Sequence, residues 1–150
     1  MGFNDDNFLD DYEIQELINK FESQLESGMP LFFDADELNI ILEHYVQKND
    51  IPKINIIADL ASTYHEANPL TKLIMAKKYL SVQDAANALP YLLDESNNAD
   101  DPDYQLSLGY CYSLMDEHKK SLSAYKKAVK LLEKENCDDI YNSMAVEYMM

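Results

Sequence analysis

The chain has 150 residues, 47% hydrophobic and 27% charged, and its 28 acidic and 12 basic side chains give a formal net charge of −16. This length suits one domain, and the hydrophobic content is too high for an intrinsically disordered chain. No apolar run approaches the roughly 18 residues that a membrane span needs, and the start MGFNDDNFLDDYE is acidic where a secretory signal would be basic and then apolar. We therefore expect a cytoplasmic protein without membrane insertion.

All twelve basic residues are lysine. Because arginine supplies the planar fork that reads guanine and phosphate, we expect no nucleic-acid partner. Half of the lysines lie between residues 119 and 134 at helical spacing. This spacing predicts a solvated helix face, and the alternative is a docking strip for an acidic partner. The two cysteines, Cys111 and Cys137, form no CxxC pair, so we expect reduced thiols in or near a core.

Helices are predicted along the whole chain, and no segment sustains the alternation of a strand. The first covers residues 7–27, with Gly28 as its C-cap. The second covers residues 35–48, because Asp34 and Glu37 form a capping box.

Prolines mark the openings of later helices. Pro52 fits the first turn of a third helix. Asn68-Pro69 and Asp101-Pro102 each place a capping side chain before a proline, which needs no backbone donor in the first turn.

Pro90 conflicts with a helix that would begin near Asp84. A proline in a helix interior costs about 3 kcal/mol, so we expect a late or kinked start with Asn87 as the N-cap.

A small or aliphatic residue followed three positions later by a tyrosine recurs along the chain. The pairs are Leu42 and Tyr45, Ala76 and Tyr79, Gly109 and Tyr112, and Ala145 and Tyr148, at steps of 34, 33 and 36 residues. A period near 34 indicates helical hairpins that bury their apolar faces by stacking on one another.

The stretch DPDYQLSLGYCYSLMDEHKKSLSAYKKAVKL resembles a tetratricopeptide repeat. Leu108, Gly109 and Tyr112 match the pattern of its first helix, and Tyr125 and Ala128 match the aromatic residue and the alanine of its second. In that family the small residue of the first helix lets the second helix pack close. We expect this role for Gly109, which costs roughly 1 kcal/mol in helix propensity relative to alanine.

The resemblance covers about residues 34–150 and implies an all-α fold, a right-handed α-α superhelix of tandem hairpins. The repeats would span about residues 34–68, 69–101 and 102–136, with a partial repeat at 137–150. An extra acidic helix within residues 1–33 would pack on the array.

The resemblance also implies a protein–protein interaction scaffold whose first helices line a concave groove. The groove positions carried over to this chain are Asn39, Glu43, Gln47, Leu73, Lys77, Leu80, Leu106, Tyr110, Ser113, Asn142, Val146 and Met149. An apolar floor with acidic flanks suits a hydrophobic peptide or an amphipathic helix with basic edges. The alternative is that segments of the protein itself cover these side chains.

No pattern for catalysis or metal binding is present. None of the three histidines, His44, His65 and His118, belongs to an HExxH motif. The chain has only three glycines, and they are too far apart in the sequence to form a phosphate-binding loop. The acidic stretch 94–103 lacks the turn glycine and closing glutamate of an EF-hand. We therefore expect a non-enzymatic protein without a cofactor or metal.

The last ten residues, YNSMAVEYMM, are apolar and rich in methionine. A repeat array needs a polar cap on its last face. We therefore expect either a larger multi-repeat protein or a homodimer formed through residues 138–150.

Overall fold

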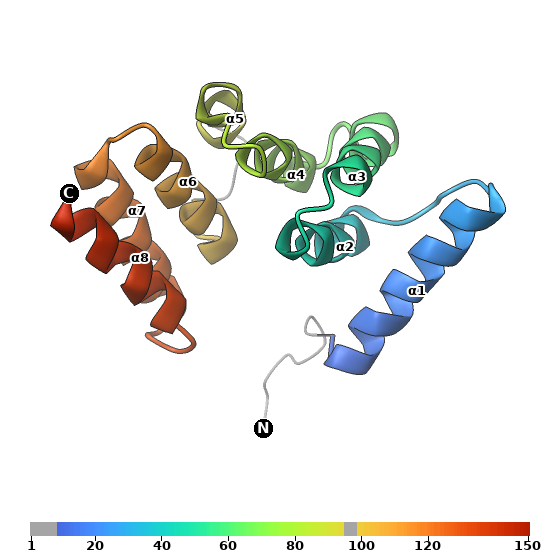
Figure 1. Ribbon diagram of the computed structural model, residues 1–150, viewed down its shortest axis with the longest axis horizontal. Helices are drawn as coiled ribbons and strands as arrows, with labels where there is room; N and C mark the ends of the chain where they lie inside the picture. The colour runs from blue at the N-terminus through green and yellow to red at the C-terminus, as the bar shows by residue number, and fades with distance from the viewer. Residues whose placement is uncertain (1–8, 95–98) are drawn as a thin grey trace. The chain divides into compact units, whose positions relative to one another are not determined.

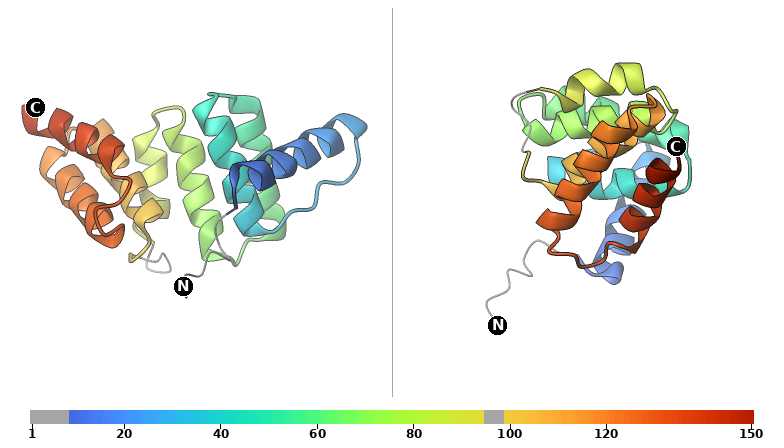
Figure 2. Two further views of the ribbon diagram at one scale, coloured as in Figure 1. Left: turned by 90° about the horizontal axis from the view of Figure 1, so that it is seen from below. Right: turned by 90° about the vertical axis from the view of Figure 1, so that its left-hand side faces the viewer.

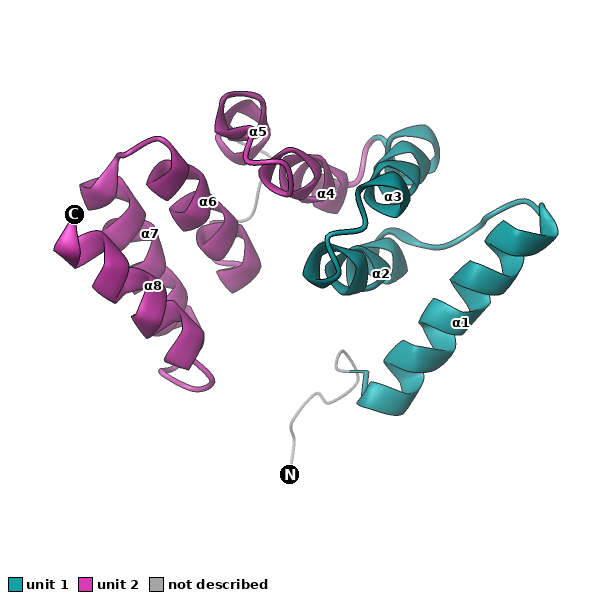
Figure 3. Ribbon diagram, in the orientation of Figure 1, with its two compact units in different colours: residues 1–66 teal, residues 67–150 magenta. Residues whose placement is uncertain are grey.

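The computed structural model describes residues 9–94 and 99–150, which form eight α-helices and no strand (Figure 1). The helices are α1 (Asp11–Ser27), α2 (Ala35–Gln47), α3 (Ile51–Tyr64), α4 (Pro69–Leu80), α5 (Ala85–Leu92), α6 (Pro102–Leu114), α7 (His118–Leu131) and α8 (Asp138–Met149). The predicted all-α class is confirmed. Residues 7 and 8 of the first predicted helix lie outside the described residues, and its predicted start is too early, because α1 begins at Asp11 with Asp10 as its N-cap. The chain divides into unit 1, residues 1–66, and unit 2, residues 67–150 (Figure 3). No helix in the described part combines the length and apolarity needed to span a membrane.

Capping side chains set most helix ends where the sequence predicts them. The Asp34 carboxylate accepts from the Glu37 N–H, and the Glu37 carboxylate accepts from the Asp34 N–H, which completes the capping box. Asn68 and Asp101 cap α4 and α6, and a proline follows each of them in the first turn. Gly28 ends α1 in the left-handed region, at φ 71°. These caps satisfy backbone groups that have no partner within the helix.

The start of α5 differs from the expectation. The helix begins directly after Asp84, whose carboxylate accepts from the backbone N–H of Asn87 at 3.2 Å and from its side-chain amide at 2.7 Å. The predicted N-cap at Asn87 is therefore wrong, and Pro90 lies inside the helix. The helix tolerates it because Pro90 and Ala86, whose carbonyl loses its partner, are both exposed to water.

The helices recur at a spacing near 34 residues along the chain. α2, α4, α6 and α8 begin at residues 35, 69, 102 and 138, whereas α3, α5 and α7 begin at residues 51, 85 and 118. The intervals are 34, 33 and 36 residues in the first set and 34 and 33 in the second. α2 packs on α3, α4 on α5, and α6 on α7, so each of these pairs is a helical hairpin.

The turn within each hairpin repeats as well. Asn49, Gln83 and Asp116 occupy the left-handed region, at φ 54°, 60° and 58°. The N–H of the residue after each donates to a tyrosine carbonyl five positions back. These pairs are Asp50 and Tyr45 at 3.0 Å, Asp84 and Tyr79 at 2.9 Å, and Glu117 and Tyr112 at 2.9 Å. The bond is that of a Schellman motif, which usually has glycine at the left-handed position.

Unit 1 is held together by aromatic rings. α1 packs on α2, and α2 packs on α3 (Figure 2). The ring of Phe21 on α1 lies 5.9 Å from that of Phe33 and 5.7 Å from that of Tyr45, between centroids. The Tyr45 hydroxyl donates to Oε1 of Glu22 at 2.7 Å. Burial and this hydrogen bond raise the pKa of Tyr45, so the hydroxyl stays a donor and ties α1 to α2.

Unit 2 has a core that combines small side chains with leucines. α4 packs on α5, α5 on α6, α6 on α7 and α7 on α8, and α4 also contacts α6. Ala76, Ala85 and Ala88 are buried together with Cys111. Cys111 and Cys137 are buried free thiols, as predicted. Burial raises the pKa of the Cys111 thiol, which keeps it protonated.

At Gly109, α6 and α7 approach too closely for a side chain. A Cβ added to Gly109 would lie 2.7 Å from Cδ1 and from Cε1 of Tyr125 on α7. Ser121 of α7 donates its hydroxyl to the Gly109 carbonyl at 2.8 Å, so a buried hydrogen bond joins the helices at the same point. The predicted role of Gly109, to make room for the second helix, is confirmed.

We expect Gly109→Ala to lower the free energy of unfolding by about 1 to 3 kcal/mol, because overpacking outweighs the helix propensity gained. Urea denaturation followed by circular dichroism measures this change. In a Tyr125→Leu background, which lacks the ring, the same substitution should cost nothing or stabilise the fold. An equal cost in both backgrounds would contradict the close approach at Gly109.

Candidate functional site

The predicted groove residues differ in exposure. On α2 of unit 1, Asn39 and Glu43 are half-buried and Gln47 is exposed. On α8 of unit 2, Asn142, Val146 and Met149 are all exposed. Leu106 and Ser113 on α6 are half-buried, and Tyr110 is 40% exposed.

The three predicted residues on α4 lie in the interior of unit 2. Leu73, Lys77 and Leu80 are 4%, 7% and 5% exposed. Leu73 and Leu80 belong to the core beneath α5 and α6. The ammonium of Lys77 lies 2.6 Å from a carboxylate oxygen of Asp103 on α6. These side chains hold α4 to its neighbours and leave little surface for a partner.

An apolar groove lies between α6 and α8, with α7 as its floor. Its lining residues are Leu106, Tyr110, Tyr125, Asp139, Ile140 and Ser143, and its volume is about 290 Å³. Only two of these six, Leu106 and Tyr110, belong to the predicted groove set. We call this hollow the α6–α8 groove.

The charge state of the groove is set by one tyrosine and one aspartate. Burial and the nearby carboxylate of Glu147 raise the pKa of Tyr125 to about 12, so its hydroxyl is neutral at physiological pH. Asp139 is exposed in the first turn of α8. The groove therefore combines an uncharged interior with one negative charge at its edge.

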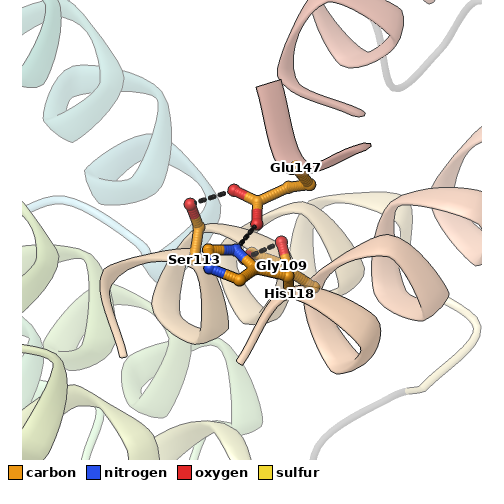
Figure 4. Close-up of polar contacts among 5 residues, drawn as sticks. Gly109, Ser113, His118 and Glu147 are labelled. Atoms are coloured by element: carbon orange, nitrogen blue, oxygen red, sulfur yellow. Dashed lines mark hydrogen bonds and ion pairs between the residues drawn. The ribbon is translucent and has the colours of Figure 1, made fainter. Parts of the chain in front are cut away.

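A buried carboxylate holds α8 against α6 and α7. Glu147 on α8 is 4% exposed. The hydroxyl of Ser113 on α6 donates to its Oε1, and Nδ1 of His118, the first residue of α7, lies 2.5 Å from its Oε2 (Figure 4). Both oxygens of the carboxylate thus have a partner, as a buried charge requires.

The geometry of this Glu147 cluster differs from that of a catalytic triad. In a triad the serine hydroxyl donates to the imidazole, which the carboxylate orients from its other nitrogen. Here Ser113 and His118 contact the two oxygens of one carboxylate instead. The cluster joins three helices and so positions α8 beside the α6–α8 groove.

Histidine, cysteine and acidic side chains form no metal-binding group within the described ranges. In the acidic stretch 94–103, Asp94 pairs with Lys72 at 2.7 Å, Asp103 pairs with Lys77, and Asp101 caps α6. Residues 95–98 lie outside the described residues. Three of the described acids in this stretch thus serve ion pairs and a helix cap.

The chain matches no family model, no curated protein and no solved structure. The functional assignment therefore rests on the contacts between residues within the chain.

Glu147→Ala should lower the free energy of unfolding by about 1 to 3 kcal/mol, because Ser113 and His118 lose their shared acceptor in a partly buried site. Hydrogen exchange should show faster exchange of the α8 amides. Asn142→Ala, at an exposed position of the same helix, is the control and should change stability by less than about 0.5 kcal/mol. If Glu147→Ala left the protection of α8 unchanged, the cluster would not be what positions this helix.

Proposed function

We propose that the chain is a tetratricopeptide-like repeat protein of the cytoplasm that binds another protein and performs no catalysis. The helix intervals of 34 and 33 residues, the repeated left-handed turn and the close approach at Gly109 support this assignment. In the family that the chain resembles, such hairpins stack into a right-handed superhelix and bind peptides along their first helices.

The α6–α8 groove is the observation that carries the proposal. Its walls come from α6 and α8, which hold the first-helix positions of two successive repeats. Its volume of about 290 Å³ suits one large apolar side chain of a bound peptide. Asp139 at its edge favours lysine or arginine next to that side chain. We therefore propose a hydrophobic peptide or amphipathic helix with basic flanks as the ligand.

Selection of random peptides displayed on phage tests this function. Enriched peptides should share an apolar residue beside lysine or arginine, and Tyr110→Glu should weaken their binding at least about tenfold. Tyr12→Glu, which replaces an exposed tyrosine of unit 1, is the matched control and should leave the affinity unchanged. Peptides that bind the parent and Tyr110→Glu equally well would exclude the groove as their site.

A second candidate function is self-association through α8. Tyr141, Tyr148 and Met149 are 46%, 62% and 85% exposed, and a contiguous apolar patch often marks an interface.

Sedimentation equilibrium distinguishes this candidate. A mass that rises from 17.3 kDa toward twice that value with concentration would support it. Because two copies of net charge −16 repel one another, salt should strengthen the association. A mass of 17.3 kDa at every concentration and salt level would rule it out.

A further inference from the structure

One face of α8 corresponds, by the repeat spacing, to a face that is covered on three other helices. Leu42 on α2 and Ala76 on α4 are 0% exposed, and Gly109 on α6 is buried. α3, α5 and α7 are the helices that pack on α2, α4 and α6 within their hairpins. Ala145 holds the same position on α8 and is exposed.

The exposed face continues along α8 as one stripe. Ala145 lies four residues after Tyr141, and Tyr148 and Met149 lie three and four residues after Ala145, which places these side chains side by side on the helix. No described helix covers the three larger side chains, as their exposure shows. We call these four residues the α8 stripe. It is separate from the α6–α8 groove, which Asp139, Ile140 and Ser143 line from another side of the helix.

Positive charge borders the α8 stripe. The ammonium of Lys126 on α7 lies 5.7 Å from the ring centre of Tyr148. Six lysines between residues 119 and 134 are all exposed, and none forms an ion pair within the described residues. α7 itself, HKKSLSAYKKAVKL, contains no acid. Lys119 lies seven residues before Lys126, on the same side of α7 by helical spacing. Lys120 lies over the ring of Tyr112 on α6, and Lys127 and Lys130 line a hollow with Asp100 and Glu133. Positive charge therefore borders the apolar stripe at Lys126 and Lys119, in a chain whose net charge is −16.

We infer that the α8 stripe binds an amphipathic helix of a partner protein, with small and aliphatic residues on its contact face and aspartate or glutamate along the edge that meets α7. Alanine at position 145 leaves room for close approach, as Ala76 does beneath α5 with Ala85 and Ala88. The lysines of α7 supply the complementary charge for an acidic edge.

The α8 helix of a second copy fits the stripe less well. It has its exposed acids, Asp138 and Asp139, together in its first turn. These two acids lie at one end of the helix and do not form an acidic edge along it. The charges thus disfavour a symmetric pairing of two α8 helices.

A matched pair of peptides tests the inference. Each has about 20 residues and is stapled, because short isolated helices are marginally stable in water. Alanine and leucine form the contact face, and one edge carries either glutamate or lysine. Fluorescence anisotropy with the full chain should show at least about tenfold tighter binding of the glutamate peptide, and this preference should shrink as salt rises.

Three variants of the chain locate the binding. Tyr148→Glu and Lys126→Glu should each lower the affinity for the glutamate peptide at least about fivefold. Val146→Glu is the control, because Val146 follows Asp139 and Ser143 on the groove side of α8 by helical spacing, and it should leave the affinity unchanged. All three positions are exposed, so circular dichroism should show an intact fold.

Equal affinity for the two peptides, or binding that Tyr148→Glu leaves intact, would overturn the inference. Loss of binding in Val146→Glu alone would place the helix in the α6–α8 groove and overturn it as well. A doubled mass that Tyr148→Glu returns to 17.3 kDa would assign the stripe to a second copy instead.

Discussion

The close approach of α6 and α7 at Gly109 is the constraint on which the other features of unit 2 depend. At Gly109 the backbone of α6 leaves no space for even a methyl group beside Tyr125. The left-handed residue in each turn brings the second helix back along the first, at the cost of placing a non-glycine residue at positive φ. The second helix of each hairpin covers one face of the first helix. On α8 no described helix covers the corresponding face, which leaves the α8 stripe exposed. Another side of α8 faces α6 and lines the α6–α8 groove.

Much of the fold could be predicted from the sequence because its signals are local. Capping residues followed by proline mark the helix starts, and Gly109 can be recognised as a small residue needed in an otherwise apolar helix. The start of α5 could not be predicted, because Asp84 gains two hydrogen bonds that offset the cost of Pro90. The turn after α4 gave no signal either, because glutamine, here Gln83, seldom adopts positive φ. Asn49 and Asp116, in the other two turns, are residue types that favour this region.

The candidate site was less predictable, because it depends on which residues distant in sequence come together. Ser113, His118 and Glu147 belong to three different helices, and no sequence spacing links them. Lys77 could be placed at a groove position from the repeat, but its burial depends on Asp103 of the neighbouring helix. Helical periodicity identifies the faces of α8, and only the contacts of α8 show that its sides differ in charge. Asp139 lies by the groove and Lys126 by the stripe, so the two surfaces should select partners of opposite charge.

Chemical-shift mapping of the isotope-labelled full chain, titrated with a peptide selected for binding, tests most directly the claim that the α6–α8 groove recognises a protein ligand. The largest shifts should fall on the amides of Leu106, Tyr110, Ile140 and Ser143, with the amides of α1 unchanged. Shifts centred on unit 1, or spread evenly over the chain, would contradict the claim.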